Sequence, residues 1–282
     1  MYPAYAKINL GLLVLNKRPD GYHNIMTVFH RIDVLDRISF APSKQINVRS
    51  TSTEAPSDET NICYKAARLL SEALNVTDGV TITIDKKIPV GAGLGGGSSD
   101  AATVLRNLPA FWGRSAGPEL LRELALKLGS DVPYFLGTES AVASGRGEIL
   151  QYFRLDLPYT ILLCNPNIHI ATGWAYGQLR PQEGRGQTDL RAIVVDGVRN
   201  PHILNANLVN DFEAAVFTAH PEIGELKETM ISGGAAYAAM SGSGSSVYGL
   251  FADPGKASSL AASLGTRGYR TFITPPHFLP AD

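Results

Sequence analysis

Cysteine is scarce in this sequence: among 282 residues there are two, Cys63 and Cys164. They stand far apart and belong to no CxxC pair or Cys/His cluster. Their scarcity excludes a disulfide framework and a structural zinc site, and a reducing, cytoplasmic compartment is expected.

Charge is also sparse and balanced. Charged residues make up 18% of the chain, and 25 Lys and Arg stand against 26 Asp and Glu, a formal net charge of −1. No run of Lys or Arg supplies the basic face that a nucleic-acid-binding protein needs. The expected partner is therefore a small molecule and not a nucleic acid.

Long apolar segments are missing as well. The N-terminus lacks a basic segment followed by a long apolar one, so no signal peptide is expected. Residues 229–252 carry no charge, but they are rich in Gly and Ser, which predicts loops and a buried strand instead of a membrane span. No membrane partner is expected, and the oligomeric state, monomer or homodimer, stays open.

Hydrophobic periodicity predicts strands and amphipathic helices without regular alternation, which is the α+β fold class. The predicted strands are 8–15, 25–32, 38–41, 46–51, 80–85, 159–164, 246–252 and 269–274, and the predicted helices are 61–74, 119–128, 220–230 and 255–264. Two lobes are expected, residues 1–153 and 154–282, with a loop at 180–186 in the second.

The strongest local signal is the glycine-rich segment PVGAGLGGGSS at residues 89–99, which follows a predicted strand and precedes a helix. Glycines allow close approach of the backbone, and the free N–H groups and dipole of a helix start attract phosphate. The segment lacks the lysine of a GxxxxGK[ST] loop, and Asp100 comes too early for a dinucleotide fingerprint. It predicts a phosphate site, and the alternative is a flexible loop capped by Ser98.

A carboxylate stands on a stiff turn in the sequence GSDVP, residues 129–133. Gly129 is expected to end the preceding helix, and Pro133 holds the residue before it extended. Asp131 is thereby fixed in an apolar frame and needs a partner. Either it acts in catalysis or it caps the following turn.

Lys7 precedes a strand that is predicted to be buried, an unusual place for a charge unless it faces a site. Asn9 has the same side-chain parity on a strand, so both polar ends should share one face. Taken alone, Lys7 fits a strand-end lysine whose ammonium reaches solvent better than a catalytic one, and the pair with Asn9 is more informative than either residue. The later segment SGSGSS, from Ser241, offers another close backbone approach or is an ordinary turn, and His23 is either a site residue or a solvated loop histidine.

The order of these segments resembles that of the GHMP kinases. The resemblance is carried by AKINL (6–10), RPDGYH (18–23), PVGAGLGGGSSDAA (89–102), GSDVP (129–133), NDFE (210–213) and MSGSG (240–244). It spans nearly the whole chain. The glycine-rich loop indicates only the superfamily, whereas the RPDGYH and GSDVP turns resemble the branch that phosphorylates a cytidine-carrying acceptor.

The resemblance implies an N-terminal lobe of ribosomal-protein-S5-like topology that binds ATP and a C-terminal α+β lobe that closes over the acceptor. Lys7 and Asp131 would be the catalytic pair. The residues expected at the ATP phosphates are Pro89, Val90, Gly91, Ala92, Gly93, Leu94, Gly95, Gly96, Gly97, Ser98 and Ser99. The residues expected around the acceptor are Asn9, Tyr22, His23, Thr172 and Tyr176, and those of the third motif, near the phosphates, are Gly242, Ser243 and Gly244.

The expected reaction is transfer of a phosphoryl group from ATP to the 2-hydroxyl of a cytidyl-methylerythritol acceptor, in isoprenoid precursor synthesis by the non-mevalonate route. Positioning and charge stabilisation suffice for such a step. Mg²⁺ should accompany ATP, with Ser99 as its nearest protein contact. The alternatives are a mevalonate or homoserine kinase, a non-catalytic nucleotide-binding module, and an RNA-binding protein with an S5-like lobe.

Overall fold

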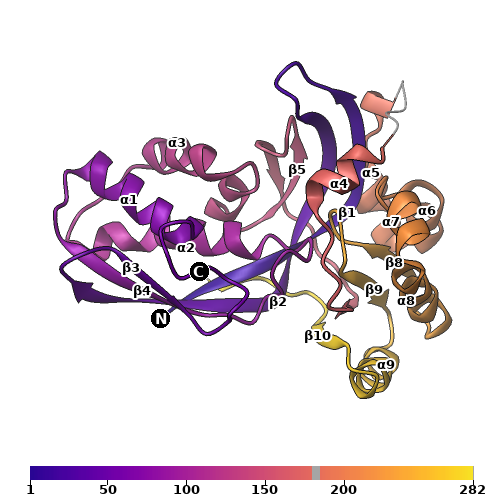
Figure 1. Cartoon of the computed structure of the whole chain (residues 1–282). Helices are drawn as coiled ribbons and strands as arrows, with labels where there is room; N and C mark the ends of the chain where they lie inside the picture. Colours follow the sequence, from indigo (N-terminus) through magenta and orange to yellow (C-terminus); the bar gives the residue numbers. More distant parts are fainter. Residues whose placement is uncertain (180–184, 282) are drawn as a thin grey trace.

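A computed structural model describes residues 1–179 and 185–281, and its first half is built on a six-stranded sheet (Figure 1). The strand order is β3-β4-β2-β5-β6, and β1 pairs with β2 in antiparallel register. These strands are β1 Tyr2–Lys17, β2 His23–Ser43, β3 Asn47–Ser50, β4 Gly79–Asp85, β5 Ser140–Ser144 and β6 Ile149–Phe153. The helices of this half are α1 Ile62–Leu74, α2 Gly96–Phe111, α3 Pro118–Leu128 and the 3₁₀ turn η1 Val132–Leu136.

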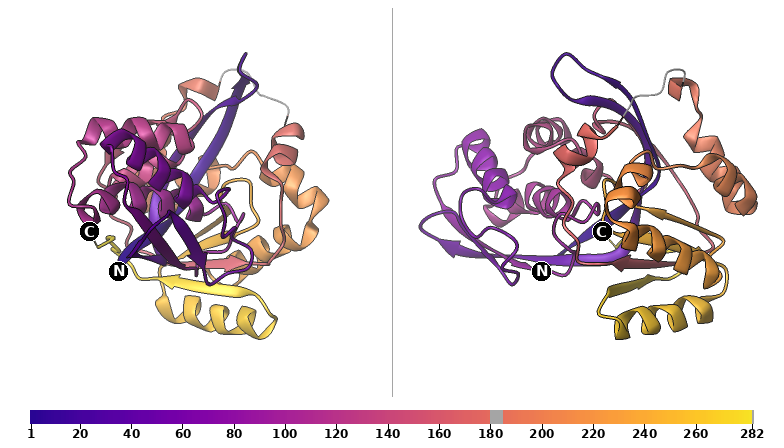
Figure 2. Two further views of the ribbon diagram at one scale, coloured as in Figure 1. Left: turned by 60° about the vertical axis from the view of Figure 1, so that its left-hand side comes forward. Right: turned by 45° about the vertical axis from the view of Figure 1, so that its right-hand side comes forward.

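The second half is built on a four-stranded sheet of order β10-β7-β9-β8. Its strands are β7 Thr160–Asn165, β8 Tyr237–Met240, β9 Val247–Phe251 and β10 Arg270–Thr274. Its helices are α4 Thr172–Gly177, η2 Arg185–Gln187, α5 Leu190–Arg199, α6 Pro201–Asn207, α7 Glu213–Ala219, α8 Pro221–Ser232 and α9 Pro254–Thr266. Figure 2 shows α9 lying along the outer side of this sheet, beside β10.

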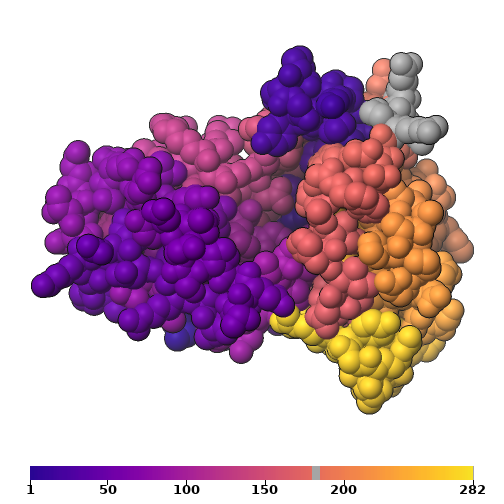
Figure 3. Space-filling view, in the orientation of Figure 1, coloured from indigo at the N-terminus to yellow at the C-terminus, as the bar shows by residue number. Residues whose placement is uncertain are grey.

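Three hydrophobic clusters hold the layers together. One lies between the six-stranded sheet and α1–α3, with Ile82 and Leu105 among its members. The second joins β1 and β2 to the four-stranded sheet and contains both Ile8 and Tyr248, and the third packs β7–β9 against α7–α9 around Met230. Because the second cluster draws on both halves, β1 is buried where they meet. Figure 3 shows the two halves side by side, the first mostly in indigo to magenta and the second in orange to yellow.

The predicted α+β class is confirmed, since the strands form two separate sheets that helices cover without regular alternation. The strands predicted at 25–32 and 38–41 form one strand, β2, because the acidic side chain that interrupts the apolar pattern, Asp36, is buried in an ion pair with Lys86. Helix α2 begins at Gly96, earlier than the apolar pattern indicates, since Gly95 adopts φ 68° and turns the chain into the helix.

Helix α8 occupies the start of the uncharged 229–252 stretch, and strands β8 and β9 follow it. In the part of the chain that is described, no helix combines the length and apolar character needed to cross a bilayer. Of the predicted loop at 180–186, residues 180–184 lie outside the described residues.

Candidate active site

Lys7 and Asp131 meet at the junction of the two halves. The Nζ atom of Lys7 lies 3.6 Å from Oδ2 of Asp131 and donates hydrogen bonds to Oδ1 of Asn9 at 2.7 Å and to the carbonyl of Gly93 at 3.1 Å. The contact with Asn9 confirms that both side chains share one face of β1. Lys7 is 4% exposed, so its ammonium does not reach bulk solvent as a strand-end lysine would.

Burial lowers the pKa of Lys7 from its usual 10.5, and the carboxylate of Asp131 opposes that shift. Asp131 stands at the start of η1, but its side chain makes no capping hydrogen bond there. Its carboxylate instead lines a cavity of about 210 Å³ with Lys7 and Asn9, which we call the central cavity. The arrangement places one ammonium and one carboxylate around a space where an acceptor hydroxyl can enter.

The glycine-rich loop borders a second space of about 340 Å³, the nucleotide cavity. Gly95 is the N-cap of α2 and has no side chain to cap the helix, so the first N–H groups of α2 are available to a ligand. Of the predicted ATP-binding residues, those that line this cavity are Pro89, Val90, Gly91, Ala92, Gly93, Leu94, Gly95, Gly96, Gly97 and Ser98. Asn61 and Lys86, which the sequence interpretation did not include, line it too.

Ser99 is 2% exposed and is not among the residues lining the nucleotide cavity. Its proposed contact with a metal ion stays a prediction, whereas the neighbouring Ser98 does line the cavity. Among the described residues, no group of three or more His, Cys, Asp and Glu side chains is placed to hold a metal ion.

The third glycine segment packs directly on the nucleotide loop. A Cβ on Gly93 would lie 2.0 Å from the carbonyl oxygen of Ser241, so glycine is required there. The hydroxyl of Ser241 donates to the carbonyl of Gly93 at 2.9 Å. Gly242 and Ser243 line the central cavity, whereas Gly244 is turned toward the side chain of Met240.

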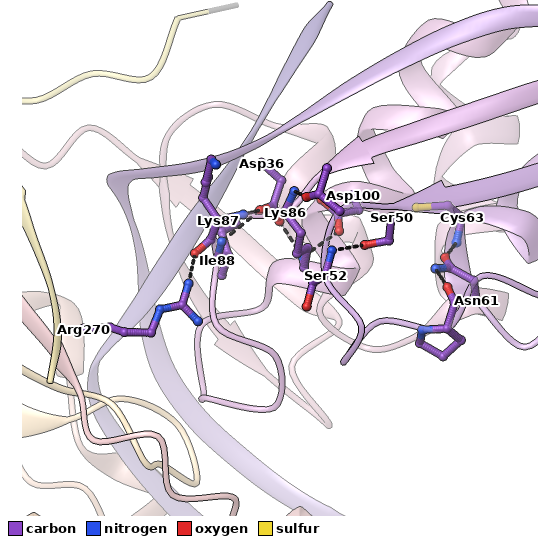
Figure 4. Close-up of polar contacts among 12 residues, drawn as sticks. Asp36, Ser50, Ser52, Asn61, Cys63, Lys86, Lys87, Ile88, Asp100 and Arg270 are labelled. Carbon is purple, nitrogen blue, oxygen red and sulfur yellow. Dashed lines mark hydrogen bonds and ion pairs between the residues drawn. The ribbon is translucent and has the colours of Figure 1, made fainter. Parts of the chain in front are cut away.

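An ion cluster lies beneath the start of α2 (Figure 4). The Nζ atom of Lys86 donates to Asp36 and, at 2.7 Å, to Oδ2 of Asp100. Burial alone would lower the pKa of Lys86, but the two carboxylates raise it, while burial raises the pKa of Asp100 well above its usual value. The cluster connects β2, the end of β4 and α2, and so fixes the helix start that faces the nucleotide cavity.

A third space, the acceptor cavity, measures about 680 Å³ and lies between the β1–β2 hairpin and α4. Figure 1 shows this hairpin rising beside α4. Tyr22, His23, Thr172 and Tyr176 all line it, so the structure brings these predicted acceptor residues together, whereas Asn9 lies in the central cavity. Thr172 and Tyr176 line both spaces.

Aromatic rings form the wall of the acceptor cavity. The rings of His23 and Tyr176 stack with centroids 5.1 Å apart, and Tyr176 meets Phe212 edge-on at 4.9 Å. Burial, with a smaller effect from Lys17, lowers the pKa of His23, which favours a neutral ring that can donate and accept hydrogen bonds. Burial raises the pKa of Tyr176 to about 12, so its hydroxyl keeps its proton.

Sequence reasoning missed Arg146, which lines both the central and the acceptor cavity. It stands in the turn between β5 and β6, and its guanidinium carbon lies 4.8 Å from the ring centroid of Tyr22. The motif SGRGE around it carried no recognisable signal, because a lone arginine between two glycines is typical of an exposed turn.

Two segments of the chain match the domain models of one class of kinases. Residues 61–138 match the GHMP kinases N terminal domain, and residues 196–270 match the GHMP kinases C terminal domain. The glycine-rich loop and the Lys7–Asp131 pair agree with this class, whose members are small-molecule kinases that use ATP.

Similar proteins extend the match to the full chain. A 4-diphosphocytidyl-2-C-methyl-D-erythritol kinase from Chlorobium luteolum is 45% identical over 98% of this chain and 96% of its own length. One from Chlorobium chlorochromatii is 45% identical over 99% of this chain and 97% of its own. The chain therefore belongs to the GHMP kinases, in the family of 4-diphosphocytidyl-2-C-methyl-D-erythritol kinases.

Solved structures agree with that placement. A crystal structure of 4-(cytidine 5'-diphospho)-2C-methyl-D-erythritol kinase is 34% identical, has a TM-score of 0.82 and covers 97% of each chain. The mevalonate kinase of Methanococcus jannaschii has a TM-score of 0.75 over 98% of this chain and 97% of its own, at 14% identity. The latter shows the shared fold alone.

Proposed function

We propose that this chain transfers the γ-phosphoryl group of ATP to the 2-hydroxyl of 4-diphosphocytidyl-2-C-methyl-D-erythritol. One observation carries the proposal: the central cavity, with Lys7 and Asp131, lies between the nucleotide cavity and an acceptor cavity walled by His23 and Tyr176. The nucleotide and central cavities share Gly91, Gly93 and Gly95, so a phosphoryl group can pass from one to the other.

In this scheme Asp131 accepts the proton of the 2-hydroxyl as its oxygen attacks the γ-phosphorus. Lys7 orients the carboxylate and stabilises the negative charge that develops on the transferred group. The N–H groups at the start of α2 bind the phosphates of ATP, since they point into the nucleotide cavity without intrahelical partners. Asn9 keeps Lys7 in place through the 2.7 Å hydrogen bond.

Mg²⁺ would enter with ATP and neutralise phosphate charge. A small protein ligand set suits this ion, which keeps several waters and binds substrate phosphates. Ser98, or Ser99 as expected from the resemblance, would supply a hydroxyl. Among the described residues, no group of three or more His, Cys, Asp and Glu side chains is placed to supply further ligands.

The acceptor cavity supports the choice of substrate within the superfamily. A cytosine has two flat faces and a mixed donor and acceptor edge, which suit the rings of Tyr176 and Tyr22 and the neutral imidazole of His23. Mevalonate and homoserine have no ring and would make no contact of this kind with these side chains.

In this proposal residues 1–153 hold the nucleotide while residues 154–282 close over the acceptor, with α4 as the closing wall. We place the reaction in the cytoplasm, where the two free cysteines would stay reduced.

The test is a comparison of acceptors with purified protein, ATP and Mg²⁺. We expect kcat/KM for the cytidyl acceptor to exceed that for mevalonate or homoserine by at least about a thousandfold, because a site built around buried polar groups rejects ligands that leave them unpaired. ADP release without an acceptor is the control. Comparable turnover of mevalonate or homoserine would contradict the proposal.

A further inference from the structure

The side chain of Arg146 occupies the passage between the acceptor and central cavities. Three residues line both spaces, namely Arg146, Thr172 and Tyr176, and Arg146 carries the charge among them. Any ligand that extends from the aromatic wall to the Lys7–Asp131 pair must pass these three side chains. Its middle part would therefore lie beside a guanidinium.

The backbone presents Arg146 in a fixed way. Gly145 and Gly147 flank it with φ values of 69° and 114°, which glycine adopts without strain. A Cβ on Gly147 would lie 3.4 Å from Oδ1 of Asp131, so this turn rests against the catalytic carboxylate. The position of Arg146 is thus tied to that of the reacting centre.

The guanidinium has unused donor capacity. Its Nε atom is buried without a hydrogen-bond partner, and Oε1 of Glu148 lies 3.8 Å away, beyond hydrogen-bond distance. The side chain as a whole is 31% exposed, with its guanidinium over the ring of Tyr22. The planar guanidinium can donate two parallel hydrogen bonds, which favours a multiply charged group with several acceptor oxygens, such as phosphate.

We infer that Arg146 binds the diphosphate of the acceptor and so helps to select a nucleoside diphosphate-linked alcohol over a plain nucleoside. The inference rests on the proposed function, in which cytidine occupies the acceptor cavity and the reacting hydroxyl the central one. The diphosphate joins these two ends, so it must lie in the passage. Its charge would be repelled by Asp131 without a cation between them.

The test measures binding of cytidine and of CDP by calorimetry, with ADP saturating so that the nucleotide cavity is filled. In the wild type, CDP should bind more tightly than cytidine. In Arg146→Met, CDP affinity should fall about tenfold to a hundredfold while cytidine affinity stays within about twofold, as expected for loss of a charged hydrogen bond. Arg146→Lys keeps the charge but loses the planar guanidinium, so its affinity for CDP should lie between that of the wild type and that of Arg146→Met.

The matched control is Arg154→Met, which removes the same charge from an exposed position lining a different pocket. Unchanged CDP affinity in Arg146→Met, or an equal loss for cytidine and CDP, would overturn the inference while leaving the proposed function standing. Wild-type protein that bound neither ligand would overturn both. A loss of CDP affinity in Arg154→Met equal to that in Arg146→Met would show a general charge effect and also overturn the inference.

Discussion

The carboxylate of Asp131 makes no capping hydrogen bond and faces the buried ammonium of Lys7 at 3.6 Å. A carboxylate that served only as a helix cap would accept hydrogen bonds from backbone N–H groups. Here the carboxylate oxygens remain available to an acceptor hydroxyl, since the side chain of Asp131 is 32% exposed while the following Val132 and Phe135 are buried. The role of base therefore fits this position better than the role of cap.

Replacing Asp131 by Asn should lower kcat by roughly two to four orders of magnitude, because the amide cannot accept the proton. ATP affinity should change little and the fold should be kept, although the melting temperature should fall somewhat because the buried ammonium of Lys7 loses its carboxylate partner. Turnover would be followed by ADP release and nucleotide binding by calorimetry. Asp196→Asn, on the exposed face of α5, is the matched control, and near-normal turnover of Asp131→Asn would rule out the base.

Local motifs identified Lys7 and Asp131, the proposed catalytic pair, and most of the residues that line the three cavities, because these residues lie in short, distinctive segments. The sequence analysis did not identify three residues of the site region, namely Lys86, Asp36 and Arg146. Their roles depend on partners that are distant in sequence. Asp36 and Lys86 stand 50 residues apart and pair only after β2 and β4 have formed. No periodicity or spacing records such a contact.

At the scale of elements, the start of α2 is tightly packed. A Cβ on Gly96 would lie 2.8 Å from Cγ2 of Ile88 and 3.1 Å from Nζ of Lys86. Gly96 therefore lets the helix start approach both the loop before it and the ion cluster below it.

Gly96→Ala should weaken ATP binding by about tenfold or more, because the helix start must move away from Ile88 and carry its N–H groups with it. Cytidine affinity at the acceptor cavity should stay the same. Calorimetry with each ligand tests this, and Gly265→Ala in α9, where a Cβ meets nothing within 4 Å, is the control. Unaltered ATP affinity would mean that the loop is only a turn.

The long amphipathic helices and several strands were predictable from the sequence, whereas other elements were not. Helices α1 and α3 match their predictions closely, since Asn61 accepts a hydrogen bond from Cys63 N as the N-cap of α1 and Gly129 follows the last residue of α3. The prediction omitted β5, β6, β8 and α4–α7, and length alone does not explain this, since α5 has 10 residues and β3, which was predicted, has 4. Their conformation is set by packing in the tertiary fold.

At the scale of the whole molecule, His30 links stability to pH. Burial lowers its pKa from 6.5 to about 4, and its Nδ1 lies 2.9 Å from the hydroxyl of Ser140. The unfolded chain takes up a proton near pH 6.5, whereas the folded protein resists protonation until about pH 4. The free energy of unfolding should therefore fall as pH drops through that window.

Between pH 7 and pH 5 the wild type should lose about 2 kcal/mol more stability than His30→Gln, which cannot be protonated. Urea unfolding at each pH, followed by circular dichroism, measures the difference. Parallel pH profiles of the two proteins would show that His30 is not the group responsible.

Strand β1 has a consequence for the order in which the chain can fold during synthesis. The strand leaves the ribosome long before β9, yet the backbone of Asn9 is hydrogen-bonded to the side chains of Tyr248 and Ser241, which are 239 and 232 residues further along the chain. In the nascent chain β1 can pair with β2 early. One face of that pair stays exposed to solvent until β9 and the rest of the four-stranded sheet have been translated and can pack on it. The active-site junction is thus among the last parts to be completed, and a ribosome that stalls before β9 leaves an apolar strand face exposed to chaperones and proteases.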